Sequence, residues 1–244
     1  MPSRYKRRTI LSMVGSSIAL TVAGCVGSPD SDDSNESSNQ TVGSPNSDES
    51  NGSSNQTQES ITTNDLTFDV SVEEHFTETH PARIQVALTN TLETPVSLSS
   101  GITPPFTSYL SGSQSDENRL VLVPDVSEDE SPLDWIGEPD PIPTSTENGC
   151  WNVAQDVEIE DIGLVIELDQ GETSSQQYDV YGYQNDSCPS SGAYQFEDTM
   201  KIYNGQPSND TPEYEVALGF TVTLDEDQSL SVEKEDPTVK TTKD

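Results

Sequence analysis

The feature that most limits the fold of this chain is a period of two in its apolar residues, which begins at Leu66. Leu66, Phe68, Val70 and Val72 alternate with polar residues, and the segment Ile84–Leu88 repeats the pattern. Successive side chains of a β-strand point to opposite faces, so this alternation is typical of strands buried on one face. We therefore expect paired strands at the start of the folded region.

Further short apolar segments continue this pattern up to Leu224 and are separated by turn residues. They are Val96–Leu98, Leu120–Val123, Leu164–Leu168, Gln177–Tyr181, Ala193–Phe196, Met200–Tyr203 and Tyr214–Leu224. No long stretch has the period of an amphipathic helix. Roughly eight short strands with Gly, Pro, Asn and Asp between them predict an all-β domain, an antiparallel sandwich or barrel. We place it at residues 65–226, followed by an acidic C-terminal tail at 227–244.

Residues 25–64 are almost entirely small or polar and contain too few branched apolar residues to form a core. Within them, residues 26–41 recur with few changes as residues 42–57. A short repeat of residues that cannot pack indicates a lengthened spacer. We expect a disordered tether here.

The first 24 residues have the three-part form of an export segment. Basic residues precede an uncharged run from Ile10 to Gly24, which is shorter than the about 20 apolar residues of a spanning helix. An ordinary buried helix with a structural cysteine is the alternative. Arg7-Arg8-Thr9-Ile10-Leu11 resembles the twin-arginine export motif, and Val22-Ala23-Gly24-Cys25 resembles a lipobox. The resemblance implies cleavage before Cys25, a lipid on Cys25, and a chain held on the extracytoplasmic face of the bilayer.

The chain is strongly acidic, with 44 Asp and Glu against 10 Lys and Arg, a formal net charge of −34. Four of the basic residues lie in the export segment, so cleavage would change the charge from −34 to −38. Such a charge is tolerable where molar salt shortens the screening length to about 3 Å. Acidity combined with these two motifs resembles haloarchaeal surface lipoproteins. A nucleic-acid partner is not expected, because phosphates need a basic surface.

Three segments resemble parts of immunoglobulin-like surface modules of bacteria and archaea. They are Pro81–Asn90, Leu168–Thr173 and Ser190–Phe196. In the third, Tyr194 stands where those modules carry the tyrosine of a tyrosine corner. The resemblance implies an immunoglobulin-like sandwich. It does not imply the antibody disulfide, because Phe196 occupies the position of the second cysteine.

Cys150 and Cys188 remain as an even pair once Cys25 is assigned to lipid. In an oxidising exterior a disulfide is the default for such a pair. The alternative is a metal or redox pair, but neither cysteine belongs to a C-x-x-C motif and neither has a histidine nearby. We predict a structural disulfide.

The two histidines, His75 and His80, lie in the connection between the first two expected strands. With neighbouring glutamates they offer ligands for zinc or copper. The interpretation we favour is a solvated hairpin tip, since their spacing exceeds i, i+4. A blue-copper site is excluded, because no histidine follows Cys188. We expect no bound metal and no other cofactor.

No catalytic arrangement is evident in the sequence. A nucleophilic triad would need one of the two histidines, and neither a Gly-x-Ser-x-Gly elbow nor a Gly-rich phosphate loop is present. Paired carboxylates for glycoside cleavage remain open, but 44 acids make any single pair uninformative. We expect a protein that is not an enzyme.

The connection from Pro124 to Cys150 holds five prolines, which exclude a regular strand through most of it. Trp135 and Ile136 are among its apolar anchors. Long connections in compact domains either cover the core or recognise a ligand. We favour a cover with Trp135 docked on the sandwich and keep a recognition loop at Trp135 and Ile136 as the alternative.

These observations favour a binding, adhesion or envelope interaction module, whose partner is an envelope protein or a glycan. Two alternatives stay open: an accessory lipoprotein that delivers a small ligand to a transporter, and a hydrolase that uses carboxylates from its loops. A single deep pocket would favour either alternative over a flat interaction surface.

Overall fold

A computed structural model of the protein describes residues 60–112, 118–137, 141–183, 188–203 and 212–242. These residues form an all-β domain within a compact unit that spans Gln56–Asp244. Apart from the short 3-10 turns Thr63–Asp65 and Glu128–Glu130, all regular structure in these ranges is strand. The all-β antiparallel fold class predicted from the alternation is confirmed.

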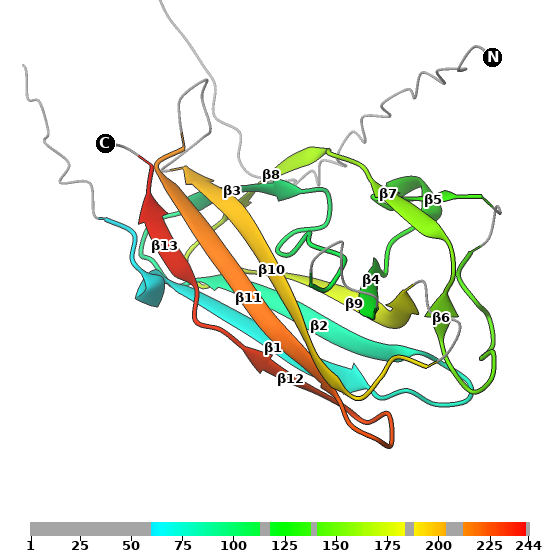
Figure 1. The fold of residues 1–244 in the computed structure, drawn as a ribbon. Coiled ribbons are helices and arrows are strands. Elements are labelled where there is room, and N and C mark those ends of the chain that lie inside the picture. The colour runs from blue at the N-terminus through cyan, green and yellow to red at the C-terminus, as the bar shows by residue number, and fades with distance from the viewer. Residues whose placement is uncertain (1–59, 113–117, 138–140, 184–187, 204–211, 243–244) are drawn as a thin grey trace, which may run out of the picture. The chain divides into compact units, whose positions relative to one another are not determined.

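The strands form two layers, sheet A and sheet B, and a separate two-stranded ribbon (Figure 1). Sheet A has the order β1 (Leu66–Glu74), β2 (Ala82–Asn90), β9 (Thr173–Tyr183), β4 (Arg119–Pro124), and β6 (Asn152–Val153) adds to β9 in parallel. Sheet B has the order β12 (Leu230–Lys234), β11 (Tyr214–Leu224), β10 (Gly192–Tyr203), β3 (Val96–Gly101), β8 (Gly163–Leu168), and β13 (Thr238–Thr241) also pairs with β11. The ribbon pairs β5 (Leu133–Ile136) with β7 (Asp156–Ile159).

The core lies between the two sheets, where the alternating apolar residues meet. Phe220 of β11 is at its centre, with ring centroids 5.2 Å from Phe196, 4.9 Å from Phe106 and 6.5 Å from Phe68 of sheet A. Each of these rings is almost fully buried. Large aromatic side chains bury the most apolar area per residue, so this cluster ties both layers together.

The loop that follows β3, residues 102–111, enters the core. Phe106 and Tyr109 are at most 1% exposed. The Tyr109 and Thr103 hydroxyl oxygens lie 2.6 Å apart, and the Tyr178 hydroxyl of β9 donates to the Phe106 carbonyl. Burial raises the pKa of Tyr109 to about 12. A buried loop must satisfy its polar groups internally, and these hydroxyls do so.

Several segments differ from the expectations. The two predicted strands Ala193–Phe196 and Met200–Tyr203 are one continuous strand, β10. The proline-rich connection from Pro124 to Cys150 contains the strand β5, which pairs with β7. The composition of the connection does not reveal this partner strand. The expected acidic tail instead carries β12 and β13, whose backbones pair with β11.

The folded domain also begins earlier than expected. Ile61, which we placed in the tether, is 8% exposed and belongs to the core cluster. A capping box between Thr62 and Asp65 fixes the short turn before β1. The tether prediction for residues 25–59 lies outside the described residues.

Candidate functional site

The residues predicted for export and lipid attachment, Arg7, Arg8 and Cys25, lie outside the described residues. Cys150 and Cys188 form a disulfide. It joins the segment before β6 to the segment before β10, which are 38 residues apart in sequence. The disulfide prediction is confirmed.

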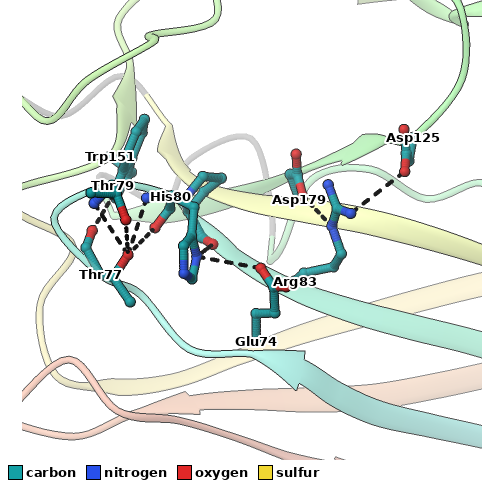
Figure 2. Close-up of polar contacts among 9 residues, drawn as sticks. Glu74, Thr77, Thr79, His80, Arg83, Asp125, Trp151 and Asp179 are labelled. Carbon is teal, nitrogen blue, oxygen red and sulfur yellow. Dashed lines mark hydrogen bonds and ion pairs between the residues drawn. The ribbon is translucent and has the colours of Figure 1, made fainter.

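The two histidines lie in the connection between β1 and β2, and Figure 2 shows His80 beside Glu74. The His80 Nδ1 donates to the Pro81 carbonyl at 2.9 Å and is 3.4 Å from the Glu74 carboxylate. His75 Nδ1 accepts from the Leu230 backbone N–H at 3.4 Å. Each ring thus has a polar contact within the fold. No group of three His, Cys, Asp or Glu residues suited to a metal ion occurs among the described residues.

The loop between β1 and β2 is fixed by contacts from other segments (Figure 2). The Trp151 indole N–H donates to the Thr77 carbonyl at 2.7 Å. At the start of β2, the Arg83 Nε donates to Asp179 at 2.8 Å, and this hydrogen bond raises the pKa of Arg83. These contacts are structural: each polar group faces a partner within the fold.

Trp135 and Ile136, the predicted recognition residues, differ in exposure. Trp135 is half-buried and packs against both core clusters. Ile136 is 52% exposed at the end of β5. The position of Trp135 supports the covering role, and recognition through Ile136 stays a prediction.

A groove of about 400 Å³ lies beside β8, where the loop after β3 and the turn between β7 and β8 face each other. Hydroxyl groups of Ser99, Ser100, Thr107 and Thr199 contribute to its lining. The turn adds Glu160 and Asp161, and β10 adds the exposed Lys201. A groove with many hydroxyls and charges of both signs can hydrogen-bond a small polar ligand.

A partly buried carboxylate supports the groove wall. Asp198 occupies a position of β10 between the core residues Phe196 and Met200. It accepts hydrogen bonds from the backbone N–H of Thr107 at 2.5 Å and of Thr199 at 2.7 Å. Burial raises the pKa of Asp198. The hydrogen bonds to Asp198 hold Thr107, which lines the groove, against β10.

Four exposed aliphatic side chains lie at the turn from β7 to β8, and two of them line the same groove. Ile159 and Ile162 line the groove and are 45% and 44% exposed. Leu164 and Val165 follow on β8 at 39% and 46%. We call these four residues the β7–β8 apolar surface. Leu164 and Val165 are successive strand residues, so they are exposed on the two opposite faces of β8. Exposed apolar residues gathered in one region mark an interaction site more often than single exposed residues do.

Sequence reasoning missed this surface. The sequence predicts a strand at Leu164 and Val165, and a strand with one face on the core buries alternate residues. The sequence does contain one signal, the uninterrupted apolar run Leu164-Val165-Ile166. A strand with one buried face needs an apolar residue only at every second position. The groove left no sequence signal, because its residues come from four separate segments.

Comparison of the chain with protein-family models, with curated proteins and with solved structures finds no match. In the part of the chain that the structure describes, no helix has the length and apolar character needed to cross a bilayer.

Proposed function

We propose that this chain is a membrane-anchored extracytoplasmic lipoprotein whose β-sandwich binds a component of the cell envelope. Anchoring rests on Arg7-Arg8 and on the lipobox that ends at Cys25. The acidic composition supports a saline exterior as its medium. The Cys150–Cys188 disulfide is consistent with an oxidising compartment.

We further infer an immunoglobulin-like arrangement of the sandwich. The order β1-β2-β9-β4 in sheet A corresponds to A-B-E-D, and β11-β10-β3 in sheet B corresponds to G-F-C. The Tyr194 hydroxyl donates to the Ser190 carbonyl at 2.6 Å, as a tyrosine corner requires. One departure is that β8, beside β3, follows β4 in the chain. The inference supports a binding role by analogy of fold only.

The observation that carries the binding role is the β7–β8 apolar surface beside the groove. In a chain of net charge −34, four aliphatic residues between Ile159 and Val165 stay exposed around the turn from β7 to β8. Apolar burial stabilises a complex by roughly 25 cal/mol per Å² removed from water, and salt does not screen it. The surface thus offers binding energy in a medium where charge pairs are weak.

The test measures binding of labelled chain to washed envelopes in molar salt. The envelopes come from cells that lack this chain, so a second copy on the membrane cannot supply the signal. We expect saturable binding that Ile162→Asp reduces about tenfold, a loss of roughly 1.4 kcal/mol. Glu215→Asp on the outer face of sheet B serves as a control that leaves binding unchanged. Binding that does not saturate, or that Ile162→Asp leaves intact, contradicts the proposal.

The groove favours one second candidate, the accessory lipoprotein that carries a small ligand. The groove volume of about 400 Å³ lies within the usual range of ligand sites. Under this alternative, Lys201→Ala and Thr199→Ala would abolish binding of a polar small molecule while envelope binding persists. Equilibrium dialysis of the purified chain against an envelope-free extract of small molecules separates the two candidates.

A further inference from the structure

The four outer edges of the two sheets are protected to different degrees. At the β1 edge, the Lys234 ammonium donates to the Phe68 carbonyl at 2.8 Å, and this side chain occupies part of the edge. The loop that follows β3, residues 102–111, covers β4, since the Tyr109 backbone carbonyl accepts from the Leu122 N–H at 2.8 Å. The edge formed by β12 and β13 carries the charged residues Glu233, Lys234 and Lys240. Covering and charge are the usual means of preventing edge-to-edge association.

The fourth edge is β8, which no other part of the described chain covers and which carries little charge. It pairs with β3 along Gly163–Leu168 and with no other strand in the described ranges. Half of the backbone groups of an edge strand point away from its neighbour and stay free to pair. Glu167 is the one charged residue of β8, and the adjacent Leu164 and Val165 are exposed. A second strand can therefore add to β8.

We propose that β8 pairs with β8 of a second copy of this chain, antiparallel and about a two-fold axis at Val165. Such an axis perpendicular to the sheet keeps the side chains of both copies on matching faces. Val165 then opposes Val165 of the second copy, and Leu164 opposes its Ile166. Cross-strand pairs of aliphatic residues stabilise a ladder.

The charges of β8 fit this register. Glu167 opposes Gly163 of the second copy, which has no side chain, so the carboxylate keeps its access to water. At both ends of the ladder, Asp161 opposes Asp169 of the second copy. Like charges directly opposite each other destabilise a pair of strands, and salt weakens that repulsion. The pairing is thus self-complementary at its centre and sensitive to salt at its ends.

A second copy fits this edge better than an unrelated acidic partner does. Both copies of a chain of net charge −34 repel each other over most of their surface, so association is confined to a region of sparse charge. Ile162–Ile166 contains no charged residue. The central pairing needs no basic partner, and it extends sheet B across the two molecules.

Sedimentation velocity of the full chain tests the proposal, with Cys25→Ser to exclude acylation and a free thiol. Between about 0.1 M and 1 M KCl the screening length falls from about 10 Å to about 3 Å. We expect dimer to increase with salt over the range in which far-ultraviolet circular dichroism shows folded chain. Asp161→Asn removes the end repulsion and shifts dimer formation to lower salt. A chain that stays monomeric at every salt concentration overturns the proposal.

Two further variants fix the site and the register. Val165→Glu places two carboxylates against each other at the axis, so we expect it to raise the dimer Kd at least about tenfold. Thr238→Glu is the control, because it adds the same charge on the exposed strand β13 and should leave the Kd unchanged. Val165→Cys forms an intermolecular disulfide, because directly opposed residues have Cα atoms within disulfide range. Glu167→Cys opposes glycine and does not. The β8 pairing is overturned if Val165→Glu and Thr238→Glu weaken the dimer equally, or if Glu167→Cys cross-links the dimer and Val165→Cys does not.

This pairing and the proposed envelope binding share Leu164 and Val165, so each is tested by its own measurement. Loss of dimer in Val165→Glu, measured without envelopes, supports the pairing alone. Ile159→Asp changes a groove residue of β7 that lies outside the ladder. Loss of envelope binding in Ile159→Asp with an unchanged dimer supports the envelope site alone.

Discussion

The carboxylate of Asp198 accepts two hydrogen bonds from Thr107, one from its backbone N–H at 2.5 Å and one from its hydroxyl at 3.0 Å. These residues come from different segments, β10 and the loop after β3, which are 91 residues apart in sequence. Because Asp198 lies at a core-facing position, the loop and the central strand are joined by a partly buried polar contact. Such contacts are costly to leave half-made.

We therefore expect Asp198→Ala to lower the free energy of unfolding by about 1–3 kcal/mol, since it leaves the Thr107 donors without their acceptor. Thr107→Val removes the hydroxyl, and the double variant should cost less than the sum of the two single changes. Urea denaturation in constant salt measures all three. Glu197→Ala, an exposed neighbour on the same strand, should change stability by no more than about 0.5 kcal/mol, and strict additivity would argue against the contact.

The stability contributed by Asp198 should depend on pH. Burial raises its pKa in the folded chain above the ordinary value of 3.8, so the folded state binds a proton more readily than the unfolded state. Its contribution is greatest below pH 3.8 and falls as the pH rises through the raised pKa. The free energy of unfolding of the native chain minus that of Asp198→Asn should thus decrease from acid to neutral pH. A difference that increases with pH would contradict the burial argument.

The Cys150–Cys188 disulfide should stabilise the domain by about 3–4 kcal/mol on the loop-entropy model. Replacing both cysteines by serine avoids a leftover thiol and should lower the midpoint of urea unfolding accordingly. The native fold should persist, because the core aromatic cluster lies elsewhere in the sandwich. Detection of two free thiols in unreduced, denatured mature protein would contradict the bond.

Trp135→Ala distinguishes a cover from a recognition loop. Trp135 is half-buried against both core clusters, so its loss should cost roughly 2 kcal/mol, about half the value for a fully buried aromatic residue. We expect envelope binding to stay unchanged in the folded variant. Ile136→Ala, which alters an exposed neighbour, should leave stability nearly unchanged. Lost binding in folded Trp135→Ala would support recognition instead.

Alternation was sufficient to predict the main strands of both sheets. The segments around Phe68, Val86 and Leu218 each bury alternate residues, as expected for strands with one face on a core. The prediction divided β10 in two because Asp198 interrupts the apolar pattern. Only the fold supplies Thr107 as the partner that makes a carboxylate tolerable there.

Composition was misleading where pairing depends on the backbone. Asp, Glu and Lys dominate the segment that holds β12, yet its backbone pairs with β11 while the charges stay exposed. Prolines in the connection that holds β5 hid a short strand in the same way. The groove and the β7–β8 apolar surface depend on which loop lies beside β8, and local patterns carry no information on that.

The most direct measurement of the central claim is the intact mass of the N-terminal fragment of the mature protein, purified from its native membrane. The account predicts a chain that begins at Cys25 and carries covalently bound acyl groups, and that Cys25→Ser releases into the aqueous fraction. A chain that retains its first 24 residues, or that begins at Cys25 with a free thiol, would contradict the account.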